Sequence, residues 1–228
     1  MSEFAEIAAL VEGKTEEIFV SKLLAPYLSA LSVYMKPIVI SKPGEKGGDV
    51  RFGRVRYDIG LHLKQRTETY LTLFIDYYGL KGDWPGLGAA KKRSHAADKA
   101  EAVNRATKDA VCHLFPERRA ERRFIPYVAM HEFEALLFSA PKILASRLQV
   151  KPARIADIVA ECGSPEEIDD SPETAPSKRL IQLSNGFRKT TTGIAVAEEI
   201  GLPGIRAQCP LFDEWLTAIE RLPASDSD

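Results

Sequence analysis

Apolar residues in the first half of the chain occur in short runs that alternate with amphipathic segments. The runs are rich in aliphatic, β-branched and aromatic residues and predict four buried strands, at residues 4–11, 33–40, 69–75 and 123–130. Helical spacing of apolar positions appears between them, at residues 15–31, 52–66 and 94–114. This alternation predicts an α/β fold with a largely parallel four-stranded sheet flanked by helices.

Strand signals stop after about residue 140. Short helical segments then alternate with turns, and residues 169–177 (DDSPETAPS) are expected to form an exposed loop. Two stronger helical patterns close the chain, around residues 192–200 and 210–222. We therefore expect an α/β core over residues 1–140 and a C-terminal helical appendage over residues 141–228, packed on the core.

The segment HEFEALLFS, residues 131–139, is predicted to form a helix directly after the fourth strand. On a helix, Phe133, Leu136 and Leu137 share one apolar stripe that must face the core. Glu132 and Glu134 then project to opposite flanks, about 200° apart around the axis. This geometry predicts that the two cannot easily serve one metal, and that His131, three residues before Glu134, shares the flank of Glu134.

The charge balance limits the function classes. The 228 residues include 31 Lys plus Arg and 32 Asp plus Glu, for a net charge of -1. This balance excludes a histone-like basic protein, so any nucleic-acid contact must use a local basic surface.

Three cysteines with no CxxC pair indicate reduced thiols. No secretory signal or run of about 20 apolar residues is present, so we expect a cytoplasmic protein without a membrane partner.

Acidic residues follow three of the four predicted strands. Glu12 follows the first strand, Asp76 the third, and Glu132 and Glu134 lie just beyond the fourth. Because ligands gather at the carboxyl ends of parallel strands, these carboxylates are candidate ligands for Mg²⁺ or Mn²⁺. Taken singly, each is better explained as a solvated loop carboxylate, but their shared position favours the metal site for the set. Since clustered carboxylates repel one another, removing one should leave the fold intact.

Several motifs carry a family resemblance. The stretch ALVEGKTEEIF resembles the opening of a TOPRIM domain, and LTLFIDYYG resembles its second motif. Together with HEFEALLF, PSKR and IGLPGIRAQCPLFDEWL, they resemble a TOPRIM-like bacterial family, domain of unknown function 4276, over nearly the whole chain. The resemblance implies a metal-dependent nuclease that uses Glu12, Asp76 and Glu134. It also implies a role in nucleic-acid processing or phage defence, with an ATPase partner encoded nearby.

The sequence departs from the TOPRIM pattern at one position. The second motif normally reads Asp-x-Asp, but Tyr78 stands in place of the second Asp. Asp83, in the following Gly-rich loop, could substitute for it. A rival hypothesis follows from this departure: a non-catalytic binding or regulatory subunit that keeps the fold but holds metal too weakly for turnover.

Basic residues near these motifs are candidate phosphate ligands. Lys14 follows Glu12-Gly13 at the start of a predicted helix, where an anion is favoured, although a solvated lysine is an equal alternative. The resemblance points to Lys178 and Arg179 in PSKR. His131 could act as a general acid or base, or donate a hydrogen bond at a helix end. Arginine and lysine clusters at residues 51–56, 91–93 and 118–123 could line a groove for a nucleic-acid backbone, or form solvated faces.

Overall fold

The computed structural model describes residues 4–40, 50–168, 171 and 173–222. The glycine-rich segment SKPGEKGGD at residues 41–49 and the C-terminal residues 223–228 lie outside the described residues. Contacts divide the chain into two units. Unit 1 comprises the described residues of Met1–Ile75, Gly79–Val128 and Thr217–Asp228, and unit 2 comprises Asp76–Tyr78 and Ala129–Leu216. The predicted domain boundary after residue 140 stays a prediction.

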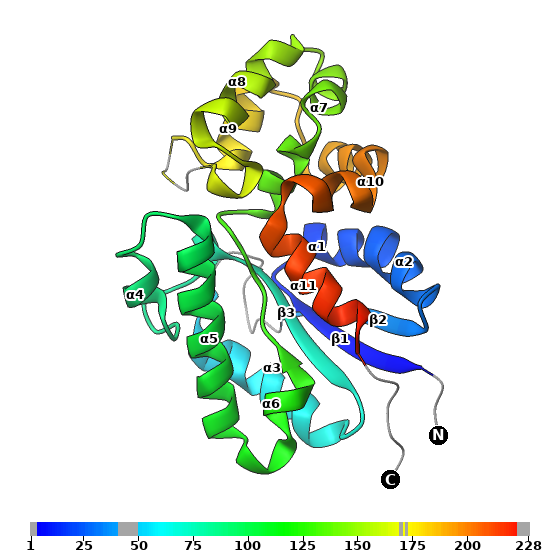
Figure 1. The fold of residues 1–228 in the computed structure, drawn as a ribbon, viewed down its shortest axis with the longest axis vertical. Coiled ribbons are helices and arrows are strands. Elements are labelled where there is room, and N and C mark those ends of the chain that lie inside the picture. The colour runs from blue at the N-terminus through cyan, green and yellow to red at the C-terminus, as the bar shows by residue number, and fades with distance from the viewer. Residues whose placement is uncertain (1–3, 41–49, 169–170, 172, 223–228) are drawn as a thin grey trace. The chain divides into compact units, whose positions relative to one another are not determined.

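Most of the sheet in unit 1 is formed by the three longest of the described strands. They are β1 (Ala5–Val11), β2 (Val33–Val39) and β3 (Tyr70–Asp76), and they lie side by side in Figure 1. Both β2 and β3 pair in parallel with β1, and Val11 lies opposite Val39 on one side and Phe74 on the other. The structure confirms the predicted α/β class with a parallel sheet. The apolar runs form strands because nearly every residue of β1 and β3 is buried.

The predicted fourth strand is broken in two. Residues Phe124–Ile125 form β4, which pairs in parallel with β3, and Val128–Ala129 form β5, which also pairs with β3. Pro126 lies in the gap between them, where a missing N–H interrupts the ladder. In the described part of the chain the sheet therefore has five strands, in the order β2-β1-β3-β4 with β5 off this path, and the prediction of four was wrong.

Helices join these strands where the apolar periodicity predicts them. The first is continuous through a π turn: α1 (Lys14–Phe19), η1 (Val20–Leu24) and α2 (Ala25–Ser29). Pro26 is the second residue of α2, directly after the π turn, and the helix continues past it. The other helices of unit 1 are α3 (Phe52–Gln65), α4 (Leu87–Ala90), α5 (Ala96–Leu114), η3 (Pro116–Arg118) and α6 (Ala120–Arg123). A short turn, η2 (Tyr77–Gly79), follows β3.

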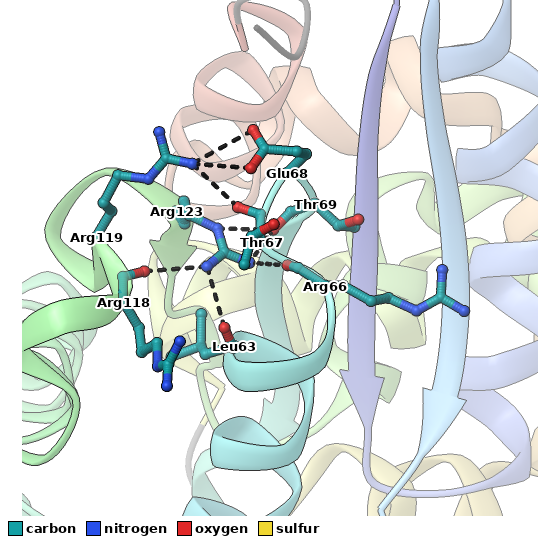
Figure 2. Close-up of polar contacts among 8 residues, drawn as sticks. All are labelled: Leu63, Arg66, Thr67, Glu68, Thr69, Arg118, Arg119 and Arg123. Carbon is teal, nitrogen blue, oxygen red and sulfur yellow. Dashed lines mark hydrogen bonds and ion pairs between the residues drawn. The ribbon is translucent and has the colours of Figure 1, made fainter. Parts of the chain in front are cut away.

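A buried arginine closes the C-terminal end of α3. The guanidinium of Arg123 donates hydrogen bonds to the backbone carbonyls of Leu63, Arg66, Thr69 and Arg118, as Figure 2 shows. A cation at a helix C-terminus is stabilised by carbonyls that no N–H of the helix can reach. Burial lowers the pKa of Arg123, with nearby Arg119 acting in the same direction. For the cluster at residues 118–123 the sequence left two alternatives, a groove lining and a solvated face, and neither applies to Arg123, which is only 6% exposed.

The C-terminal half is helical, as predicted. Its elements are η4 (Phe133–Ser139), α7 (Pro141–Leu148), α8 (Pro152–Cys162), η5 (Pro165–Glu167), α9 (Pro176–Leu183), η6 (Lys189–Gly193), α10 (Ile194–Gln208) and α11 (Pro210–Glu220). Gly201, at φ 71°, interrupts α10 where the sequence predicted a helix end. The exposed loop predicted for residues 169–177 is wrong at Ala175, Pro176 and Ser177, which are buried at the start of α9. Among the described residues, no helix combines the length and apolar character needed to cross a membrane.

A buried carboxylate holds the N-terminus of α11. Glu166 accepts hydrogen bonds from the backbone N–H groups of Leu211 at 2.9 Å and Phe212 at 3.0 Å. These groups have no partner within the helix, so the carboxylate completes its first turn. Burial raises the pKa of Glu166 to about 7, although the two hydrogen bonds lower it in part.

This shift predicts a pH-dependent stability. The folded chain keeps the Glu166 proton at higher pH than the unfolded chain, so the free energy of unfolding should fall as pH rises from about 4.5 to about 7. The contribution is on the order of 3 kcal/mol. Urea unfolding of wild type and Glu166→Gln at pH 5 and pH 8 measures it: the difference between the two pH values should shrink in the variant. Exposed Glu161 on α8 is the matched control, and an equal effect of Glu161→Gln would contradict the assignment.

Candidate functional site

The chain after β5 is held in place by the end of β3. Oδ1 of Asp76 accepts a hydrogen bond from the N–H of Phe133 at 2.9 Å. The N–H of Tyr78 donates to the carbonyl of His131 at 3.0 Å, and the ring of Tyr77 packs edge-on against the imidazole. His131 is buried and has φ 66°, a left-handed conformation that a non-glycine residue adopts at a cost. Asp76 therefore fixes a sharp turn that delivers the two following glutamates.

The predicted α-helix at residues 131–139 is not present. Glu132 is extended, at φ −149° and ψ 157°, and Phe133–Ser139 form a 3₁₀ helix. Every residue from Phe133 to Phe138 is buried, so the segment has no polar flank. The prediction that Glu132 and Glu134 face opposite ways is wrong, because Nζ of Lys189 lies 3.8 Å from Oε1 of Glu132 and 2.8 Å from Oε2 of Glu134. The extended backbone at Glu132 replaces the helical spacing that the prediction assumed.

Glu132 caps a helix. Its two carboxylate oxygens accept hydrogen bonds from the backbone N–H of Ser177, at 2.8 Å, and from the Ser177 hydroxyl, at 3.0 Å. Ser177 is the second residue of α9, where the N–H groups lack helical partners and negative charge is favoured. Glu132 therefore has a structural role in joining the turn after β5 to α9.

Glu134 forms the closest ion pair of the group. Its side chain is 1% exposed, whereas the side chain of Lys189 is 43% exposed. Partial burial lowers the pKa of Lys189, but the pKa is raised overall. The negative charge of Glu134 raises it most, followed by the charge of Glu132. The hydrogen bond to Glu134 and the charge of Asp76 act in the same direction. We call Asp76, Glu132, Glu134 and Lys189 the acidic cluster. The three carboxylates stabilise the positive charge of Lys189, whose side chain is partly exposed to solvent.

The carboxylates of the acidic cluster are suitable ligands for a divalent cation, but they are not arranged as a preformed metal site. Carboxylate oxygens suit Mg²⁺ and Mn²⁺, and the ammonium of Lys189 shows that a cation is stabilised there. Each carboxylate already accepts a protein donor: Phe133 for Asp76, Ser177 for Glu132 and Lys189 for Glu134. Among the described residues, no group of three or more His, Cys, Asp or Glu side chains stands ready to hold a metal.

Glu12 belongs to unit 1, and Asp76 and Glu134 belong to unit 2, so their sharing one site stays a prediction. Within unit 1, Glu12 directly follows β1 and its carboxylate lies against Gly79. A Cβ at position 79 would lie 2.7 Å from Oε2 of Glu12, closer than real Cβ contacts. The glycine of the DYYG motif therefore makes room for the Glu12 carboxylate.

Gly79→Ala should displace Glu12 and destabilise the protein. Overpacking in a core costs typically about 1–3 kcal/mol, and we expect the low end of this range because the group that must move is the end of a flexible side chain. The control is Gly82→Ala, three residues along, where a new Cβ meets nothing within 4 Å. Chemical denaturation of both variants tests the prediction, and equal stabilities would show that the Glu12 carboxylate moves aside freely.

The remaining predicted metal and phosphate ligands are exposed or make hydrogen bonds within the protein. Lys14 is exposed, and its Nζ lies 2.8 Å from Oε2 of Glu17. This arrangement agrees with the alternative that Lys14 is a solvated surface lysine. Asp83 is exposed and accepts the N–H of Gly53 at 3.0 Å, so it caps α3. In α9, Lys178 is exposed, and Nε of Arg179 donates to the carbonyl of Thr174. The roles of Lys14, Lys178 and Arg179 toward phosphate, and that of Asp83 toward a metal, stay predictions.

Lys189 of the acidic cluster was not predicted, nor was Ser177, which donates hydrogen bonds to Glu132. Ser177 lies in the PSKR motif, and its position after a proline at a helix start was the available signal. Lys189 stands before a run of threonines, and no local pattern marks it. The three cysteines, Cys112, Cys162 and Cys209, are free thiols, as predicted.

Comparison with known proteins gives one family. No curated protein matched the chain. Among solved structures, the chain is similar to the C-terminal region of the OLD protein of Xanthomonas campestris pv. campestris, with 14% identity and a TM-score of 0.39 over 95% of this chain and 96% of that one. No conclusion follows from a likeness at that level. The family model described as domain of unknown function (DUF4276) matches residues 11–220, and the chain therefore belongs to this family.

Proposed function

We propose that this protein is a TOPRIM-type, Mg²⁺- or Mn²⁺-dependent phosphodiesterase that acts on nucleic acid. The observation that carries the proposal is the acidic cluster after β3, in which the buried carboxylate of Glu134 lies 2.8 Å from a partly exposed cation. In parallel sheets, catalytic groups gather at the carboxyl ends of strands, where Asp76 ends β3. A role in phage defence or DNA processing, with an ATPase encoded nearby, is part of the proposal through the TOPRIM resemblance.

In this proposal, Asp76 and Glu134 hold the metal and Glu12 contributes as a ligand or general base. A bound divalent cation would neutralise phosphate charge and lower the pKa of a coordinated water. Lys189 reaches solvent, so its ammonium can bind a phosphate oxygen while Glu134 holds it in place. Glu132 keeps α9 and the turn after β5 together, and Asp76 also orients that turn through Phe133.

A second function is favoured by the same ion pair. If Lys189 remains paired with Glu134 and Glu132, it supplies the positive charge that a metal would supply. The cluster would then be a stable structural element in a non-catalytic binding or regulatory subunit. Tyr78, in place of the second Asp of the motif, favours this alternative too.

Cleavage assays on single-stranded DNA, double-stranded DNA and RNA distinguish the two. We expect cleavage of at least one substrate with Mg²⁺ or Mn²⁺ and none with EDTA. Binding should weaken steeply as salt rises, because exposed basic residues such as Lys91, Lys92 and Arg93 would release counterions from the phosphates. Salt-sensitive binding without cleavage would support the regulatory subunit, and neither binding nor cleavage would contradict a nucleic-acid role.

A further inference from the structure

A cavity lies in unit 1, among residues that are not part of the acidic cluster. It is a cavity of about 400 Å³ on one face of the sheet, beside the C-terminal end of α3. Glu6, Tyr34 and Lys36 line it from β1 and β2, and His62, Arg66 and Thr69 line it from α3 and the segment before β3. Its volume is within the range of small-molecule sites.

The sheet register explains why these side chains gather. In the parallel pair β1–β2, Glu6 lies opposite Tyr34 and Ala8 lies opposite Lys36, so all four are on one face. Glu6, Tyr34 and Lys36 are exposed, whereas Val33 and Met35 on the other face are buried. Among the described strands, β2 is at the edge of the sheet, so this face stays accessible there.

The arginine network holds one wall of the cavity. The carbonyl of Arg66 accepts a hydrogen bond from Arg123, which anchors the backbone of Arg66. Figure 2 shows the side chain of Arg66 pointing away from that network, in the direction of β1 and β2. A fixed backbone limits the entropy lost when the guanidinium binds a ligand. Arg66 is therefore a positioned and exposed donor.

His62 is a buried polar residue that lines the cavity. It is 7% exposed, and no hydrogen-bond partner of its Nε2 occurs among the described residues. Burial lowers the pKa of His62 to about 4, with Arg123 and Arg66 acting in the same direction and a hydrogen bond to the Tyr70 backbone opposing them. The imidazole is therefore neutral near pH 7. The charges at the cavity are then positive at Lys36 and Arg66 and negative at Glu6.

We propose that this cavity binds a nucleoside monophosphate. Arg66 and Lys36 supply two cations for the phosphate, since a guanidinium matches the geometry of phosphate oxygens. Glu6 accepts hydrogen bonds from ribose hydroxyls, and the exposed ring of Tyr34 provides a face on which the base stacks. Phe4 packs edge-on against Tyr34, with ring centroids 5.3 Å apart, and so restricts the orientation of that ring.

Calorimetric titration of the full chain with AMP, adenosine and inorganic phosphate tests this proposal. AMP should bind, and Arg66→Gln, which keeps the backbone carbonyl used by Arg123, should weaken AMP binding at least tenfold. Lys64→Gln is the control, because Lys64 lies two residues before Arg66, in α3, but lines a different hollow with Tyr57 and Phe115. It should bind AMP as wild type does.

Three results would overturn the proposal. They are no AMP binding at millimolar concentration, equal weakening by Arg66→Gln and Lys64→Gln, and phosphate or adenosine binding as tightly as AMP. Thermal denaturation of each variant without ligand shows whether it is folded. Because Glu134→Gln leaves the cavity intact, that variant should still bind AMP even if the protein proves not to be a nuclease.

Discussion

Glu134→Gln should reduce metal-dependent cleavage of nucleic acid on the order of 10²–10³-fold. The carboxylate is buried and forms the shortest contact with Lys189, so its loss removes both a candidate metal ligand and the group that orients the ammonium. The variant also removes one of the two negative charges paired with the ammonium of Lys189. Initial rates at saturating Mg²⁺ or Mn²⁺ measure the effect.

Glu132→Gln is the matched control for this prediction. It changes the same charge two residues away, but Glu132 holds Ser177 at the start of α9. We expect activity within a few-fold of wild type and a loss of stability of about 1 kcal/mol, because the amide retains only one of the two acceptors. If Glu132→Gln lost more activity than Glu134→Gln, Glu132 would be the functional acid.

Asp76→Asn should abolish metal-dependent activity while leaving the fold nearly as stable as wild type. Asn keeps an oxygen that can accept the N–H of Phe133 but removes the negative charge. Asp76→Ala removes both and leaves that N–H without its acceptor, which costs about 1–3 kcal/mol. The sequence-based expectation of an intact fold after any carboxylate removal is therefore replaced, for Asp76→Ala, by an expected loss of stability.

Activity and urea denaturation of the two variants separate the roles of Asp76. Full activity in Asp76→Asn would contradict a role for its charge. Equal stability of the Asn and Ala variants would show that the hydrogen bond to Phe133 contributes little.

The strands were predictable because burial on both faces imposes a recognisable composition. The runs that became β1 and β3 are apolar and β-rich, and their bounds agree with the structure within a residue or two. The run at residues 123–130 was less predictable. Its break into β4 and β5 depends on where Pro126 lies relative to the ladder of β3, which a single sequence does not show.

The cluster was predictable only in part. Asp76 and Glu134 were recognised from their place after apolar runs. The conformation of the HEFEALLF segment was not, because apolar residues at helical spacing fit an α-helix and a buried 3₁₀ helix equally well. Long-range partners were also hidden: Ser177 is 45 residues from Glu132, and Lys189 is 55 residues from Glu134. Local periodicity carries no information about such contacts.

Direct binding of Mn²⁺, followed by the loss of the free-ion signal in electron paramagnetic resonance, tests the central claim apart from any choice of substrate. The account predicts that wild type binds Mn²⁺, that Asp76→Asn loses this binding, and that Asp98→Asn, an exposed acid on α5, retains it. Wild type that leaves the free-ion signal unchanged, or Asp76→Asn that binds as tightly as wild type, would contradict a metal site in the acidic cluster.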